Sequence, residues 1–339
     1  MNKKRTLQAL FLLALIIGTI LIIRQQHSTP YQKDTGMIFG TVYNVSYQYA
    51  DDLKDEIEAE LKKVDAEFSM FNQQSTVARI NRGENPELSD MFREVFNKSK
   101  AVYQATAGAF DPTVAPLVNA WGFGFKSGDM PTHHDVDSLL RLVGFDKVEI
   151  VHDTKYEIRG TRADRRSLDF AAIAKGYGSD VIARFLRKKG IENFMVEIGG
   201  EVVTQGINRE RLPWKIGVVK PTDDSLNTQG ELQTVLNITN RAMATSGNYR
   251  NFYYKGGRKY AHTIDPKTGY PVQHSLLSAT VLADDCATAD AFATAFMVMG
   301  MEEAKKVLER HPDLLVYFIY SDSKGNLQTW HSPALSIDS

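Results

Sequence analysis

The sequence predicts an α/β protein that folds as one compact unit after an N-terminal membrane segment. Between residues 156 and 206 the chain alternates strand, helix and strand, because a helical pattern over 172–189 stops at Gly190 and the apolar run FMVEI follows it. Several β-rich runs separated by turn residues come next. No repeat of fixed period and no linker rich in Pro, Gly or Ser divides this part into independent domains.

Composition and charge narrow the class of protein. Of the 339 residues, 43% are hydrophobic and 24% are charged, which is ordinary for a globular chain with a sizeable core. Forty basic and 41 acidic side chains leave a formal charge of -1, and no stripe of Lys or Arg could neutralise a run of phosphates. We therefore expect no nucleic-acid partner.

The N-terminus carries a membrane signal. Residues 7–23 contain no charge, follow Lys3, Lys4 and Arg5, and precede Arg24. This length is short for a membrane-spanning helix and long for the core of a cleavable signal peptide. We expect an uncleaved anchor, with residues 1–6 in the cytoplasm and the rest on the periplasmic side of a bacterial inner membrane. A cleaved signal peptide is the alternative.

The single cysteine and the segment after the anchor add two expectations. Cys286 lies far from the apolar run, which excludes lipoprotein processing, and one cysteine cannot form an internal disulfide. Residues 24–36 are polar and contain Pro30, as is typical of a tether. The folded domain is therefore expected to span residues 37–339.

The elements of this domain follow from periodicity. Residues 41–49 are rich in β-formers, and the next stretch repeats apolar residues at helical spacing. A helix is expected over 90–105, with Ser89 as its N-cap and Gly108 beyond its end. The later elements are expected strands at 214–220, 232–238, 242–246, 259–264, 276–283 and 314–320, and expected helices at 286–299 and 302–310.

The segment LDFAAIAKGYGSD, residues 168–180, contains two glycines inside a helical pattern. Gly176 and Gly178 each cost about 1 kcal/mol relative to alanine in a helix interior. Such a cost suggests close approach of another backbone or of a ligand, with tight packing of the helix against a strand as the alternative, and the pattern does not decide between them. From the pattern alone, Asp169 would be an N-cap and Lys175 a solvated surface charge.

The segment ADDCATADAFATAFMVMG, residues 283–300, offers oxygen ligands. Asp290 and Thr294 are four residues apart and therefore share one face of a helix. Mg2+ accepts such ligands and commonly uses one or two protein carboxylates beside substrate phosphates. By itself, this spacing is more often a chance pair on a helix than a metal site.

The segment YAHTIDPKTGYPV, residues 260–272, forms a turn around Asp265, Pro266 and Gly269. His262 precedes the turn, and a lone histidine in a strand is usually structural. The common nucleotide motifs GxxxxGK[ST] and GxGxxG at a strand-to-helix junction are absent from the sequence. If the protein binds a nucleotide, it must do so through residues other than these two motifs.

Six blocks together resemble the ApbE family of FAD:protein FMN transferases, in the family's order and over nearly all of the chain after the tether. They are GAFDPTVAPLVNAWGFG (108–124), LDFAAIAKGYGSD (168–180), VEIGGEVVTQG (196–206), ATSGNYRNFY (244–253), HTIDPKTGYPV (262–272) and the segment from Asp290 to Thr294. The resemblance implies the family's T-fold-like α/β architecture.

The resemblance also implies a set of site residues. For Mg2+ these are the backbone carbonyl of Ala172 and the side chains of Asp290 and Thr294. For the flavin nucleotide they are Phe39, Phe71, Trp121, Gly122, Phe123, Asp169, Lys175 and Ile264. Without the resemblance, Trp121 and Phe123 would be read as core aromatics. Relatives often have Met at the position of Phe39 and Tyr at that of Phe71, so Phe71 lacks a hydroxyl that could bond the nucleotide.

The implied reaction is Mg2+-dependent transfer of the FMN moiety of FAD to a threonine hydroxyl of an acceptor protein, with release of AMP. His262 is a candidate general base for that hydroxyl. Subunits of the Na+-translocating NADH:quinone reductase and of Rnf-type complexes are candidate acceptors. The alternatives are an FAD pyrophosphatase that releases FMN and AMP, and a flavin-binding protein without chemistry.

Overall fold

The computed structural model describes residues 3–123, 130–152, 156–159, 166–221, 231–248, 252–255 and 258–337. The helices are α1 (Lys3–Ser28), α2 (Lys54–Phe68), α3 (Thr76–Asn81), α4 (Asp90–Ala105), α5 (Ala115–Ala120), α6 (His133–Leu140), α7 (Ala171–Lys188), α8 (Cys286–Met299) and α9 (Met301–Leu308), with a 3-10 turn at η1 (Phe145–Lys147). The strands are β1 (Tyr31–Ile38), β2 (Thr41–Gln48), β3 (Glu149–His152), β4 (Tyr156–Arg159), β5 (Phe194–Ile198), β6 (Glu201–Gln205), β7 (Trp214–Val219), β8 (Leu232–Ile238), β9 (Ala242–Gly247), β10 (Phe252–Lys255), β11 (Arg258–Ala261), β12 (Leu276–Ala283), β13 (Leu315–Ser321) and β14 (Leu327–His331).

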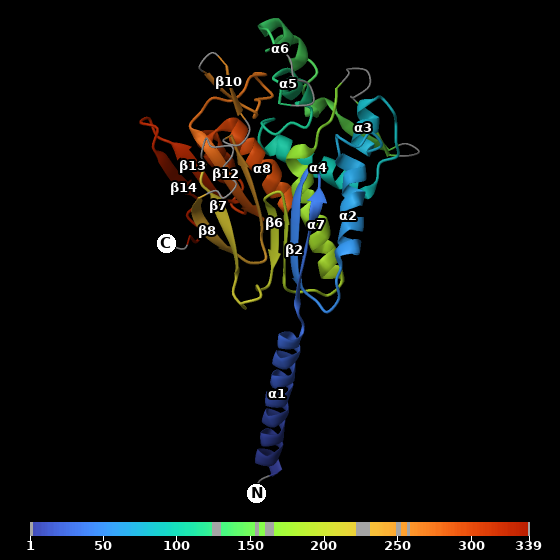
Figure 1. Cartoon of the computed structure of the whole chain (residues 1–339), viewed down its shortest axis with the longest axis vertical. Helices are drawn as coiled ribbons and strands as arrows, with labels where there is room; N and C mark the ends of the chain where they lie inside the picture. The colour runs from blue at the N-terminus through green and yellow to red at the C-terminus, as the bar shows by residue number, and fades with distance from the viewer. Residues whose placement is uncertain are drawn as a thin grey trace.

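One large sheet organises the domain. Its strand order is β1-β2-β5-β6-β9-β12-β13-β14, and all neighbouring strands are antiparallel. The pairs β3-β4, β7-β8 and β10-β11 form small separate hairpins. Figure 1 shows α1 projecting from one end of the domain, with α5 and α6 at the opposite end. The predicted α/β class and the single compact unit are confirmed.

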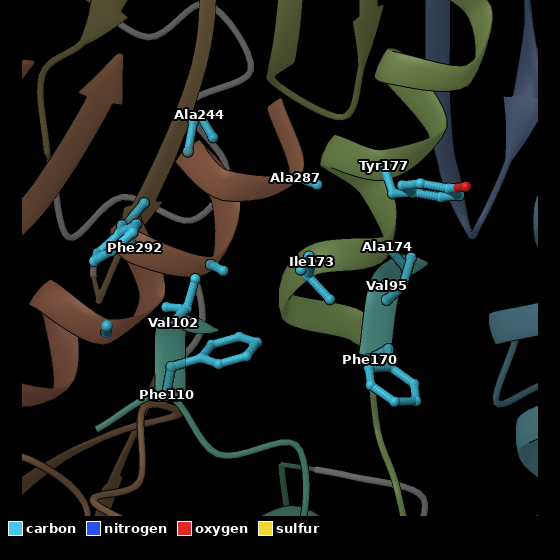
Figure 2. Close-up of a cluster of buried hydrophobic side chains, with 14 of the residues drawn as sticks. Val95, Val102, Phe110, Phe170, Ile173, Ala174, Tyr177, Ala244, Ala287 and Phe292 are labelled. Atoms are coloured by element: carbon cyan, nitrogen blue, oxygen red, sulfur yellow. The ribbon is translucent and has the colours of Figure 1, made fainter. Parts of the chain in front are cut away.

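The main core lies between this sheet and the helices α4, α7 and α8. In Figure 2, Ala287 at the start of α8 lies next to α7, and Ile173 and Ala174 of α7 belong to the same buried cluster as Ala287 and Phe292. Half of the buried residues of α8 are alanine, which allows neighbouring backbones to approach closely. The helix that carries Asp290 and Thr294 is therefore enclosed by α7, α4 and the sheet strands β9 and β12.

Most predicted elements are present close to their expected bounds. The helices expected at 90–105 and 286–299 have these bounds in α4 and α8, and α7 begins one residue earlier than expected. The strand expected over 259–264 is shorter, because β11 ends at Ala261 and Ile264 forms only an isolated bridge with Pro271. Residues 249–251 of the block at 244–253 lie outside the described residues.

The expected tether at 24–36 differs from the structure. Helix α1 continues to Ser28, and β1 begins at Tyr31, paired with β2 along its full length. The sequence concealed this strand because β1 lies at the sheet edge and buries only one of its residues, Asp34, whose carboxylate accepts the Tyr47 hydroxyl at 2.7 Å. An edge strand with a buried polar residue lacks the apolar alternation that marks a strand.

Helix α1 and the sheet are joined by a short connection that is hydrogen-bonded to the sheet. The carbonyl of Thr29 accepts the side-chain amide of Gln48 at 3.0 Å, and the carbonyl of Pro30 accepts the N–H of Tyr49 at 3.0 Å. Within α1, the segment Lys4–Arg24 has a mean hydropathy of 2.6 and none of it is buried. By length and composition this segment is suited to cross a membrane, a property that an N-terminal signal sequence shares.

Candidate functional site

A cavity of about 920 Å³ lies where α7 and α8 meet the sheet. Strands β5, β6 and β9 contribute to its walls, together with β7 and the segment around His262. The residues predicted for the site that line it are Asp169, Ala172, Lys175, His262, Ile264, Asp290 and Thr294. Together these residues span more than a hundred positions of the sequence, and the fold brings them to one cavity.

Asp290 and Thr294 lie on the face of α8 that lines the cavity, as their spacing predicts. Asp290 is 2% exposed, and its Oδ2 accepts the backbone N–H of Gly176 at 3.1 Å. The Thr294 hydroxyl lies 3.2 Å from the Ser246 hydroxyl of β9. In a regular helix the N–H of Gly176 pairs with the carbonyl of Ala172. Because that N–H donates to Asp290, the carboxylate reaches the backbone of α7 about one turn after Ala172.

Close packing around α7 explains the two helix glycines. A Cβ at Gly176 would lie 2.3 Å from the carbonyl oxygen of Cys286, and a Cβ at Gly178 would lie 2.8 Å from the ring of Phe39. Gly176 shows the close approach of another backbone that the sequence suggested, here that of α8, whereas Gly178 packs against Phe39 and against Ile198 of strand β5. This packing also permits the contact between Gly176 and Asp290.

Lys175 is placed between two buried carboxylates. Its Nζ lies 2.8 Å from Oε1 of Glu201 and 3.7 Å from Oδ2 of Asp290. Burial lowers the pKa of Lys175, but Asp290 and Glu201 outweigh this effect and raise the pKa above its usual value. Burial raises the pKa of both carboxyl groups, and Lys175 opposes the rise. Lys175 is thus an ion-pair partner in the cavity, which excludes the solvated surface charge expected from the helix pattern alone.

The donor set around Asp290 fits a hard cation. Asp290 offers a buried carboxylate, Thr294 and Ser246 offer hydroxyls, and Ala172 offers a carbonyl, all of which are oxygen ligands of the kind that Mg2+ accepts. Within the described part of the chain, no group of three His, Cys, Asp or Glu side chains converges as in a zinc-type site. The chemistry of these donors therefore agrees with a Mg2+ site that keeps positions for water and substrate oxygen.

The turn after His262 is rigidly built. The carbonyl of Asp265 accepts the N–H of Gly269 at 2.8 Å, and the Trp121 indole donates to the carbonyl of Gly269 at 2.7 Å. Trp121 is 5% exposed, so it supports the turn from the core. Phe123 lies edge-on to His262, with 6.4 Å between ring centroids. Trp121 and Phe123 thus hold the segment that carries His262 in place at the cavity.

Five residues expected at the flavin do not line the cavity: Trp121 and Phe123, which pack around the turn after His262, and Phe39, Phe71 and Gly122. Phe39 occupies the turn between β1 and β2 with φ of 53° and packs against Gly178. Phe71 lies between α2 and α3 and is 76% exposed. Gly122, which is also exposed, has φ of 81° and ends the turn after α5. Asp169 does line the cavity, and its carboxylate accepts the N–H of Ala171 at 2.8 Å.

The sequence reasoning missed Glu201 and Ser246. Both lie inside recognised blocks, VEIGGEVVTQG and ATSGNYRNFY. A signal for Glu201 was available, because a charged residue begins a strand of which four residues are buried. Ser246 carried no comparable signal, since a serine in a short strand is common and only the fold places it beside Thr294.

Comparisons with known proteins identify the family of the chain. The chain matches the ApbE family over residues 39–318. It is 36% identical to an FAD:protein FMN transferase of Haemophilus influenzae, with 92% of this chain and 94% of that protein covered. It is 35% identical to one of Vibrio cholerae, with 85% and 87% covered.

Solved structures give the same result. The flavin transferase ApbE of Vibrio cholerae has a TM-score of 0.80 at 32% identity, with 90% of this chain and 98% of that chain covered. The apo form of the flavinyl transferase ApbE of Pseudomonas stutzeri has a TM-score of 0.79 at 30% identity, with 90% and 96% covered. Sequence, fold and cavity all lead to one assignment: the chain belongs to the ApbE family.

Proposed function

We propose that this protein is an FAD:protein FMN transferase that uses Mg2+ and passes FMN to a threonine of an acceptor protein, releasing AMP. The observation that carries the proposal is the convergence of Asp290, Thr294, Lys175 and His262 on one cavity of the ApbE-type fold. The names of the relatives support the transfer of FMN from FAD to protein. Mg2+, the threonine acceptor and AMP as the product are our inference from the donor set and the resemblance.

Each cavity residue has a role in this proposal. Asp290, Thr294 and the carbonyl of Ala172 would hold Mg2+, which would offset charge on the pyrophosphate of FAD. Lys175 adds a fixed cation one turn from the start of α7, where the backbone N–H groups also favour an anion. Together they bind and orient the bond that is broken.

The proposed transfer needs no reactant other than FAD and the acceptor protein. The hydroxyl oxygen of the acceptor threonine forms a bond to the FMN phosphorus, and the bond from that phosphorus to the oxygen of AMP breaks. The hydroxyl proton passes to a base, for which we propose His262 at the cavity wall. Phe123 beside the imidazole limits the positions that the ring can take.

We also propose that α1 is an anchor in the inner membrane and that the domain lies on its periplasmic side. Basic residues before the apolar segment favour retention of the N-terminus in the cytoplasm. Membrane-associated acceptors, such as subunits of the Na+-translocating NADH:quinone reductase or of Rnf-type complexes, suit an anchored enzyme.

Co-expression with one such candidate subunit tests the activity. We expect flavin fluorescence on the denatured acceptor band and a mass increase equal to bound FMN. Replacing the modified threonine by valine should abolish both, as should Asp290→Ala in the enzyme. Release of free FMN without labelled acceptor would favour the pyrophosphatase instead. Bound FAD that stays intact would favour a flavin-binding protein without chemistry.

A further inference from the structure

Glu201 makes the cavity more negative than the proposed Mg2+ ligands alone. It is 3% exposed and begins β6 after the turn at Gly199 and Gly200, both of which have positive φ. Its backbone carbonyl accepts the Ser179 hydroxyl at 2.9 Å, and its side chain reaches Lys175 one turn earlier on α7. The residue is therefore fixed against the same helix that carries Lys175.

The cluster of Lys175, Glu201 and Asp290 contains two carboxylates and one ammonium, so it has one negative charge in excess when all three are ionised. Only one oxygen of Glu201 is paired. Its Oε2 is buried and has no hydrogen-bond partner among the residues that the structure describes. A buried carboxylate oxygen without a donor is costly, and cavities with such oxygens attract cations.

Lys175 and a metal ion compete for Asp290. The Lys175 ammonium lies 3.7 Å from Oδ2 of Asp290, close enough to weaken binding of a second cation there by repulsion. The shorter contact, 2.8 Å, is to Glu201. Glu201 is thus the group that draws the ammonium away from the proposed metal ligand.

We propose that Glu201 is a positioning residue of the cation site, which holds Lys175 away from Asp290 and supplies the excess negative charge that a divalent cation requires. This inference rests on the Mg2+ site of the proposed function. Without Glu201 the Lys175 ammonium would pair with Asp290 alone. It would then compete more strongly with the metal ion for this carboxylate, and the cavity would carry less negative charge.

Calorimetric titration of the full chain in detergent with Mg2+ alone, without FAD, tests the inference. We expect Glu201→Gln to weaken Mg2+ binding by on the order of tenfold or more, since one nearby charge is lost. Lys175→Met should strengthen binding, because it removes the competitor. Glu201→Gln should weaken binding less in the Lys175→Met background than in the wild type, because no ammonium remains for Glu201 to hold away from Asp290, whereas a simple loss of packing at Glu201 would cost the same in both backgrounds.

Glu197→Gln is the matched control. Glu197 lines the same cavity from β5, but its carboxylate accepts the side-chain amide of Asn44 at 2.9 Å. We expect it to change Mg2+ affinity by less than about threefold. If Glu201→Gln fails to fold, Glu201→Asp keeps the charge and should bind Mg2+ more tightly than a Glu201→Ala variant.

Two outcomes would overturn the inference in different ways. Glu201→Gln with the affinity of the wild type or of Glu197→Gln, while Asp290→Ala no longer binds, would reject the role of Glu201 and leave the metal site intact. Absence of Mg2+ binding by the wild type, or binding by Asp290→Ala equal to wild type, would reject the metal site and this inference with it.

Discussion

The carboxylate of Asp180 on α7 accepts the backbone N–H of Cys286, the first residue of α8, at 2.8 Å. Its second oxygen accepts the N–H of Ala287 at 2.9 Å. Both donors belong to the first turn of α8, where backbone N–H groups have no partner within the helix. A side chain of one helix therefore fixes the start of the other and, through it, the position of Asp290 beside α7.

Asp180→Asn should destabilise the fold while preserving its shape. An amide offers one acceptor oxygen, so one buried N–H of α8 loses its partner at a cost of about 1–3 kcal/mol. Chemical denaturation measures this loss. Asp284→Asn is the control, because the Asp284 side chain is 90% exposed and should change stability little. Equal stability of the Asp180 variant and the wild type would show that this link does not hold the helix.

The thiol of Cys286 should be unreactive in the native protein. The residue is fully buried, and burial raises the pKa of its thiol well above the usual value, so the thiol stays protonated at pH 8. Cys286 is the only cysteine in the sequence. Its rate of reaction with a disulfide reagent therefore measures solvent access at the junction of α7 and α8. Labelling should require unfolding and should be faster in Asp180→Asn. Rapid labelling of the native wild type would contradict this packing.

Gly176→Ala should cost more than Gly178→Ala. The new Cβ at Gly176 would lie 2.3 Å from the backbone of Cys286, which cannot move without displacing α8, whereas at Gly178 it would meet the side-chain ring of Phe39. Overpacking of this kind typically costs about 1–3 kcal/mol, against a gain of about 1 kcal/mol in helix propensity. Denaturation of both variants measures the difference. Activity should fall further for Gly176→Ala because its N–H contacts Asp290.

Local patterns predicted the helices better than the edges of the sheet. Helix α8 combines an apolar periodicity with an N-cap, Asp285, and its bounds were predicted without error. Strand β1 was not predicted because backbone hydrogen bonds to β2 hold it in the sheet. These bonds do not depend on which side chains are hydrophobic, so the sequence pattern does not show them. The ion pair between Lys175 and Glu201 could not be predicted from the sequence either. The two residues come together only when β6 packs against α7 in the folded protein.

Truncation of the N-terminus at two positions separates the proposed role of α1 in membrane attachment from the role of β1 in the sheet. Removing residues 1–28 should release the protein from membranes, with the full sheet and its activity retained. Removing residues 1–36 also deletes most of β1 and leaves the buried Tyr47 hydroxyl without Asp34, which should lower stability by at least about 2 kcal/mol. Fractionation and thermal unfolding measure the two effects. Recovery of the intact full-length chain in the soluble fraction would contradict the anchor.

His262 should affect the rate of FMN transfer more than the binding of FAD. A threonine hydroxyl is a weak nucleophile that must lose its proton during attack, and an imidazole at the cavity wall is suited to accept it near neutral pH. His262→Gln keeps a polar side chain of similar reach but cannot act as the base. We expect it to slow FMN transfer by about 100-fold or more and to change FAD affinity little.

Single-turnover transfer and FAD binding, measured on the same preparations, separate the roles of His262. Phe123→Leu is the companion variant, because it removes the ring beside His262 and keeps the imidazole. It should slow transfer less than His262→Gln, since the base remains but is held less firmly. Unchanged transfer together with weakened FAD affinity in His262→Gln would make the histidine a binding residue. The proton would then pass to another group, and carboxylates at the cavity such as Asp169 would be the next to replace.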